Sequence, residues 1–292
     1  MSARKSLHIG LNCLDPNQYG GWDGALSGCI NDANDMKAIA ESRGFTAEQL
    51  LDGEATIRAV KEKLDAYAEE LEDGDFFFLT YSGHGGQVPD QNGDEVDGYD
   101  ETWCLYDTEL VDDSLYGALC SFKQGVRIFI MSDSCHSETV SRAPAGERIP
   151  AREERRAFVD AEPGPRSKRA PIEFTTAEFN KNQDRYKEQQ TWWPPKQMPK
   201  DSPAKVVLIS GCKDAQTSMD GDGNGAFTEA FLKVWKKHGN DYPKAYKDLQ
   251  LEVLAAIVNS EQEPQIFSYG DDVDAMLAQR PFSDQDATVS IA

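Results

Sequence analysis

Two apolar, strand-like runs constrain this 292-residue chain most, because each ends in a short polar segment. Residues 75–81 (DFFFLTY) lead into a segment that contains His84, and residues 126–131 (VRIFIM) lead into one that contains Cys135. The carboxyl ends of neighbouring parallel strands meet at one edge of a sheet, where open α/β sheets bind ligands. The pattern therefore predicts that His84 and Cys135 lie together at such an edge.

A cysteine and a histidine at one edge can form a catalytic dyad. A thiol is mostly protonated at neutral pH, and a nearby imidazole lowers its pKa and later passes a proton to the leaving amine. His84 precedes Cys135 by 51 residues, and caspases carry their histidine about 50 residues before the cysteine. A lone pair of this kind is more often an inert thiol and a core histidine, but the strand context and the spacing favour the dyad.

The chain resembles the metacaspases, whose short prokaryotic form is called an orthocaspase. Four blocks carry the resemblance in the family's order: residues 28–33 (GCINDA), 81–86 (YSGHGG), 133–137 (DSCHS) and 210–218 (SGCKDAQTS). The family usually has glycine at the position of Glu138. The resemblance implies a cysteine endopeptidase with Cys135 as nucleophile and His84 as general base and acid. It also implies that the backbone amides of Gly85 and Cys135 stabilise the oxyanion.

Apolar and amphipathic segments alternate along the chain and predict an α/β protein. Strands are expected at residues 6–11, 75–81, 126–131, 205–209 and 266–269, and helices at residues 31–42, 56–71, 114–122, 227–236 and 246–258. This order predicts a caspase-like fold, with a mostly parallel central sheet of about six strands and helices on both faces. One structural domain is expected, in which residues 1–141 carry the dyad and residues 204–292 complete the sheet.

Residues 142–203 separate these two parts and differ from them in composition. Residues 142–200 hold 13 of the 30 Lys and Arg residues against 9 acidic ones, in a chain of formal net charge −21. Eight prolines interrupt this segment, so it is interpreted as an inserted linker or lid. A solvated loop is the plainer interpretation, and Trp192 and Trp193 are candidates for covering the site. Self-cleavage is expected after one of the basic residues Arg142, Arg148, Arg152, Arg155, Arg156, Arg166, Lys168 and Arg169.

The resemblance implies an acidic pocket for the residue before the scissile bond. The matching positions are Cys29, Asp32, Ser82 and Asp133. Two carboxylates in a partly desolvated pocket bind Arg or Lys through charge-assisted hydrogen bonds. Asp32 by itself could equally cap the helix expected to begin at residue 31. We therefore expect protein or peptide substrates that are cleaved after Arg or Lys.

Residues 64–122 contain 16 acidic residues and not one Lys or Arg. Such a surface repels nucleic acid and attracts basic peptides or a divalent cation, although it often serves only solubility. By resemblance, Asp100, Asp112 and Asp113 match three calcium ligands, while the position of a fourth falls near Arg142. Weak, millimolar stimulation by calcium is expected. No cofactor is expected to be required for the chemistry.

The remaining signals narrow the class of protein. Residues 220–225 (DGDGNG) open like an EF-hand loop, but Phe231 stands where the bidentate Glu is required, so a glycine-rich turn before a helix is expected. Six cysteines without CxxC spacing argue against a disulfide framework or a zinc site. The absence of a long apolar run or a signal peptide predicts a cytoplasmic protein that spans no membrane. By resemblance, a monomer is expected.

Two alternatives to a peptidase stay open from the residues alone. The first is a catalytically inactive caspase-like module that binds or regulates a partner. The second is a metal-dependent hydrolase that uses Asp133, Cys135 and His136 as ligands. It is disfavoured because three ligands so close in sequence do not easily surround one ion.

Overall fold

A computed structural model describes residues 2–90, 98–134, 167–194, 202–211, 219–221, 223–257 and 262–284. The predicted nucleophile Cys135, the atypical Glu138 and most of the basic residues of the insert lie outside these ranges. Within the described residues, no helix is both long and apolar enough to cross a bilayer.

The core of the molecule is a six-stranded sheet with the strand order β2-β1-β3-β7-β8-β9. Its strands are β1 (Arg4–Gly10), β2 (Thr46–Leu51), β3 (Phe76–Ser82), β7 (Arg127–Asp133), β8 (Lys205–Ser210) and β9 (Gln265–Tyr269). All neighbours pair in parallel except β8 and β9. The expected α/β class and the mostly parallel sheet of about six strands are confirmed.

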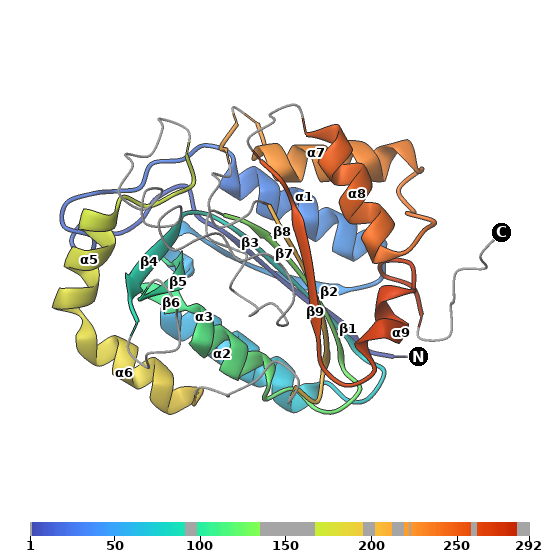
Figure 1. Cartoon of the computed structure of the whole chain (residues 1–292), viewed down its shortest axis with the longest axis horizontal. Helices are drawn as coiled ribbons and strands as arrows, with labels where there is room; N and C mark the ends of the chain where they lie inside the picture. Colours follow the sequence, from blue (N-terminus) through green and yellow to red (C-terminus); the bar gives the residue numbers. More distant parts are fainter. Residues whose placement is uncertain are drawn as a thin grey trace.

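Helices cover both faces of this sheet (Figure 1). One face carries α1 (Cys29–Ser42), α7 (Ala226–Lys237) and α8 (Tyr246–Ala256), and the other carries α2 (Ile57–Glu70) and α3 (Asp112–Leu119). Strand β3 shows why both faces are filled, because Phe76 and Phe78 enter one core and Phe77 and Leu79 the other. A short helix, α9 (Val273–Leu277), follows β9. The apolar strands and amphipathic helices were predicted because burial on a sheet face imposes these periods.

A second, smaller sheet and a pair of helices lie beside one end of the central sheet (Figure 1). The sheet consists of β4 (Gly85–Pro89), β5 (Tyr99–Cys104) and β6 (Glu109–Val111), all antiparallel. The helices are α5 (Ile172–Lys181) and α6 (Gln183–Trp192), within the segment interpreted as a linker or lid. The sequence did not reveal them, because α6 buries only Tyr186 and Gln189 and therefore has no apolar stripe.

The strand register brings the predicted site residues to one edge. Ser82 at the end of β3 pairs with Asp133 at the end of β7, and Ser132 pairs with Ser210 of β8. His84 follows β3 after a single residue, just before β4. The carboxyl ends of three adjacent strands thus form the edge at which the dyad was predicted.

Candidate active site

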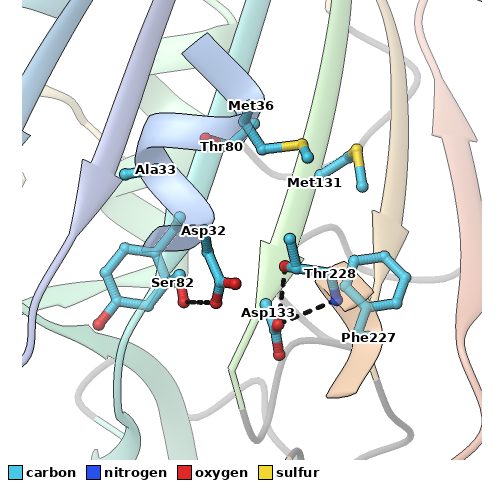
Figure 2. A pocket seen from close by; sticks show the side chains of 10 residues that line it. Asp32, Ala33, Met36, Thr80, Ser82, Met131, Asp133, Phe227 and Thr228 are labelled. Atoms are coloured by element: carbon cyan, nitrogen blue, oxygen red, sulfur yellow. Dashed lines mark hydrogen bonds between the residues drawn. The ribbon is translucent and has the colours of Figure 1, made fainter. Parts of the chain in front are cut away.

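Two carboxylates face each other at this edge. Asp32 extends from the first turn of α1, and Asp133 extends from the end of β7 (Figure 2). The hydroxyl of Ser82 donates to Asp32 at 2.7 Å, and the hydroxyl of Thr228 donates to Asp133 at 2.8 Å. A cavity of about 10 Å³ lies behind them, room for about one water molecule. The pocket predicted by resemblance is therefore assembled from three separate elements.

The pocket is occupied by the chain itself. The ammonium of Lys168 lies 3.2 Å from Asp32, 3.2 Å from Asp133 and 2.9 Å from the hydroxyl of Ser82, and its side chain is 0 % exposed. Burial by itself would lower the pKa of Lys168, but the carboxylates of Asp133 and Asp32 raise it well above its ordinary value. Lys168 is therefore a buried cation that matches the predicted pocket.

The backbone around Lys168 continues this arrangement. The amide of Gly85 donates to the carbonyl of Lys168 at 2.8 Å, and the amide of Ala170 donates to the carbonyl of Gly85 at 2.8 Å. One residue earlier, Ser167 forms an isolated antiparallel bridge with Met219. Gly85 is one of the two predicted oxyanion donors, and 2.8 Å is within the range for such a donor. Residues 167–170 thus lie across the site as an extended peptide.

Asp220 and Gly225, which precede α7 (Ala226–Lys237), contact the start of α1 and the pocket carboxylate Asp32. Asp220 accepts hydrogen bonds from the amides of Ser27 and Gly28, at 2.7 and 2.9 Å, at the start of α1. The amide of Gly225 donates to Asp32 at 3.0 Å, and α7 begins at the next residue. The helix predicted after the glycine-rich segment 220–225 is confirmed, and Asp222 within the segment lies outside the described residues. The hydrogen bond from Gly225 also helps to fix the position of Asp32.

His84 is buried and carries an ordered hydrogen bond at one ring nitrogen. Its Nε2 lies 3.0 Å from the carbonyl of Gly24. Because a carbonyl only accepts, Nε2 carries the proton and Nδ1 has the free lone pair. Among the described residues, Nδ1 has no hydrogen-bond partner. Burial lowers the pKa of His84 to about 4, so the ring is neutral at pH 7 and able to accept a proton.

Cys29, the fourth predicted pocket residue, is the first residue of α1 and is fully buried. Burial raises the pKa of its thiol to about 12. It therefore lies beside Ser82, Asp32 and Lys168 as an uncharged thiol, a poor nucleophile.

The three predicted calcium ligands lie in the second sheet and beside it. Asp100 belongs to β5, and Asp112 and Asp113 open α3; all three are buried. Within the described part of the chain, no three His, Cys, Asp or Glu side chains are grouped so that they could hold a metal ion. The calcium site stays a prediction.

Sequence reasoning missed several parts of this site. The carbonyl of Gly24 orients His84, although no orienting residue was predicted, because a backbone carbonyl leaves no mark in a sequence. Thr228 gave no signal either. Lys168 was one of eight basic candidates in the insert, and its place in the chain did not distinguish it. Trp193 instead packs on the core near α2 and donates to Asp65 at 3.0 Å.

Comparison with known proteins agrees with this geometry. Residues 13–273 match the caspase-domain model of the C14 peptidases. The chain belongs to the caspase-domain peptidase family. Among its relatives, metacaspase-1 of Mycosarcoma maydis is 29% identical over 91% of this chain and 70% of its own length. Metacaspase-1B of Aspergillus clavatus is 30% identical over 90% of this chain and 68% of its own length.

Solved structures show the same kinship. Protein GSU0716 from Geobacter sulfurreducens superposes with a TM-score of 0.81 at 40% identity and covers 97% of this chain and 99% of its own. Caspase-1 from Spodoptera frugiperda superposes with a TM-score of 0.51 at 10% identity, over 92% of this chain and 87% of its own, and shares the fold. The resemblance to metacaspases is confirmed, and these relatives support a cysteine peptidase of the caspase-like family.

Proposed function

We propose that this caspase-domain protein is a cysteine endopeptidase that cleaves peptide bonds after Lys or Arg. The observation that carries the proposal is the position of Lys168, whose ammonium lies between Asp32 and Asp133. A side chain of a substrate peptide would take the same place. An Asp side chain would instead meet two carboxylates in a low-dielectric pocket, where like charges repel strongly.

The chemistry follows from the residues around the pocket. The thiol of Cys135 loses its proton to Nδ1 of His84, and the thiolate attacks the scissile carbonyl carbon. The carbonyl oxygen becomes an oxyanion, to which the amide of Gly85 donates. When the carbon–nitrogen bond breaks, His84 returns the proton to the leaving amine. The acyl group stays on Cys135 as a thioester. Water then hydrolyses this thioester, which releases the new carboxylate and restores the thiol of Cys135.

A panel of fluorogenic peptides tests the specificity directly. The peptides differ only in the residue before the scissile bond, which is Arg, Lys, Leu or Asp. We expect cleavage after Arg and Lys only, and none by the Cys135→Ala variant. Preferred cleavage after Asp would refute the acidic pocket. Cleavage that survives the loss of Cys135 would refute the dyad, and an inactive wild-type protein would favour a caspase-like binding module.

The chain also presents its own bond in the manner of a substrate, and we place self-processing at Lys168–Arg169. Two contacts support this bond: the ion pairs of the Lys168 side chain and the hydrogen bond from the amide of Gly85 to the carbonyl of Lys168. While Lys168 fills the pocket, no other substrate can bind there. The uncut chain is therefore latent, and processing lets residues that precede Arg169 leave the site.

Mass spectrometry of the purified protein tests this assignment. The wild type should yield a fragment that begins at Arg169, whereas Cys135→Ala should stay one chain. Lys168→Gln should lose this cut, and Lys187→Gln is the matched control, because Lys187 is an exposed base of the same insert. A fragment that begins elsewhere, or an unaltered cut in Lys168→Gln, would contradict the assignment.

Stimulation by calcium is a separate proposal, and it rests on Asp100, Asp112 and Asp113. Titration of calcium into chelator-treated enzyme should raise the activity at millimolar concentrations. Full activity in excess chelator, unchanged by added calcium, would show that these aspartates do not form an activating calcium site.

A further inference from the structure

The imidazole of His84 is held by two contacts from one loop. The carbonyl of Gly24 accepts from Nε2, and the ring of Trp22 packs against the imidazole with 4.7 Å between ring centroids. A hydrogen bond at a single nitrogen leaves a ring free to pivot about that bond. Packing of Trp22 on the ring restricts this motion, so the direction of Nδ1 depends on Trp22.

Trp22 is itself held by a residue of the insert. Phe174, in the first turn of α5, stacks on Trp22 with 5.5 Å between centroids and 9° between the planes. Trp22 also contacts Tyr19 of its own loop, edge to face at 6.4 Å. Stacked aromatic pairs have a preferred geometry that single apolar contacts lack. The three rings of Phe174, Trp22 and His84 therefore form a continuous series from α5 to the predicted base.

The close approach of this loop to His84 requires glycine at position 24. Gly24 has φ of +57°, and a Cβ atom there would lie 2.9 Å from Cδ1 of Leu14 and 3.1 Å from Cδ2 of His84. A side chain at this position would push the loop away from the imidazole. The loop backbone and the imidazole thus fit closely, and a small displacement of Trp22 would reach the ring.

Helix α5 is fastened to the body of the protein by contacts that lie after the bond Lys168–Arg169. The hydroxyl of Thr175 donates to the carbonyl of Gln87 in β4 at 3.0 Å. Lys181 donates to the carbonyl of Asn17, in the same loop as Trp22, and Asn182 donates to the side chain of Gln18 at 3.3 Å. In Figure 1 this loop passes beside α5. These contacts do not involve Lys168, so its departure leaves α5 in place.

The insert therefore divides at Lys168–Arg169 into two parts with opposite roles. We propose that the part after this bond belongs to the catalytic apparatus, in which Phe174 and Trp22 are positioning residues that hold the imidazole of His84 in a single orientation. Lys168 occupies the pocket, and α5 supports the position of His84 through Phe174 and Trp22. The proposal rests on the proposed peptidase function. It assigns to the insert the positioning of His84, so removal of the whole insert should impair catalysis.

The pKa of His84 can be measured without any enzymatic activity, so it provides an independent test. Two charged groups act on the ring: the ammonium of Lys168 lowers its pKa, and the carboxylate of Asp220 raises it. The backbone carbonyls of Gly24 and Lys168 raise the pKa as well. The largest effect is burial. The ring of Trp22 packs directly on the imidazole, and the ring of Phe174 stacks on Trp22. Removal of the Phe174 ring should admit water and move the pKa of His84 from about 4 toward its unperturbed value of about 6.5.

The first experiment is an NMR titration of the four histidines in Cys135→Ala protein, which stays uncut. We compare Phe174→Leu with Phe179→Leu, which is matched because Phe179 is also a partly buried ring of α5 but packs on Tyr186. The pKa of His84 should rise in Phe174→Leu and stay unchanged in Phe179→Leu. Equal shifts in the two variants would overturn the proposal, and unfolding midpoints show whether either variant has lost its fold.

The second experiment uses the processed enzyme with Cys135 intact. Phe174→Leu should lower kcat about 10-fold with little change in KM, because misalignment of the base slows the chemical step and leaves the acidic pocket untouched. Phe174→Tyr keeps the stacked ring and should restore kcat. An unchanged kcat in Phe174→Leu would refute the positioning role. If the wild type cleaves no peptide, the proposed function fails, and the NMR titration still decides the inference.

Discussion

The molecule contains two buried pairs of carboxyl groups that are satisfied in different ways. Asp32 and Asp133 lie in the pocket and share the ammonium of Lys168. Glu109 of β6 and Glu178 of α5 lie between the second sheet and the helix pair, and the groups that donate to them are hydroxyls and an amide: Thr102 to Glu109, and Thr108, Tyr186 and Asn182 to Glu178.

The two pairs differ in what they need to stay buried. Burial and repulsion from Glu178 raise the pKa of Glu109 well above its ordinary value, and its Oε1 has no hydrogen-bond partner among the described residues. That oxygen is free to carry a proton. In the pocket, burial also raises the pKa of Asp32, but the Lys168 ammonium opposes the shift. One pair thus requires a cation and the other a proton, which distinguishes a binding site from a structural contact.

Removing one pocket carboxylate should have the largest effect. Asp133→Asn leaves the hydrogen bond to Thr228 feasible but removes half of the charge that holds a basic side chain. We expect kcat/KM for Arg and Lys peptides to fall by at least about 100-fold, equivalent to about 3 kcal/mol. The exposed carboxylate Asp184 supplies the control Asp184→Asn. Unchanged kcat/KM in Asp133→Asn would show that the Asp32–Asp133 pair is not a binding site for basic side chains.

Removing the occupant should destabilise the uncut chain. In Cys135→Ala protein, Lys168→Ala leaves Asp32 and Asp133 without a cation. We expect the free energy of unfolding to fall by about 2 kcal/mol, less than for a sealed ion pair because water can enter the vacated pocket. Urea denaturation measures the loss, and added butylamine should recover part of it only in the variant. An equal response of the parent protein to butylamine would argue that Lys168 does not fill a cation site.

The pair that needs a proton should respond to pH instead. A carboxyl whose pKa is raised by folding contributes stability that is complete below its unfolded pKa of about 4.5 and is lost as pH rises toward the folded value. Glu109→Gln mimics the protonated form and should flatten this decline, so that the variant is more stable than the parent at pH 8 by at least about 1 kcal/mol. Denaturation of Cys135→Ala protein from pH 5 to 9 tests this. A parallel decline in the variant would assign the pH dependence to other groups.

The smallest effect is expected from the group that supports Asp133. Thr228→Val removes the hydroxyl donor and keeps the backbone amide, which donates to Asp133 at 3.2 Å. Loss of one hydrogen bond to a charged group should raise KM for Lys peptides about 5-fold, or about 1 kcal/mol. Thr191→Val, on exposed α6, serves as the control. A rise in KM of the same size in both variants would mean that Thr228 does not act through the pocket.

Much of the central fold was predictable because its signals are local. The runs in β3 and β7 are mostly apolar, as is typical of strands buried on both faces. Strand β2 was missed, since Thr46–Leu51 lies at the sheet edge and buries only Leu50. The second sheet was missed as well, because its strands are short and carry polar residues such as Gln87 and Glu101.

The site was predictable to the extent that side chains carry the chemistry. Asp32, Ser82 and Asp133 were expected in one pocket by resemblance, and the structure brings them together. The dyad itself stays a prediction. The structure describes His84, but Cys135 lies outside the described residues. The contribution of Gly24 could not be predicted, because it is made by a backbone carbonyl whose position depends on a long loop.

The sequence by itself determined the class of fold, the family and the residue types of the site. Hydrophobic periodicity and short motifs depend only on residues that are close together in the sequence. Only the tertiary structure decided that Lys168, among eight basic candidates, lies in the pocket and that Phe174 reaches His84 through Trp22. The physical reason is distance along the chain. Lys168 meets Asp32 across 136 residues, and no local pattern specifies a contact that forms only when the separate elements pack together.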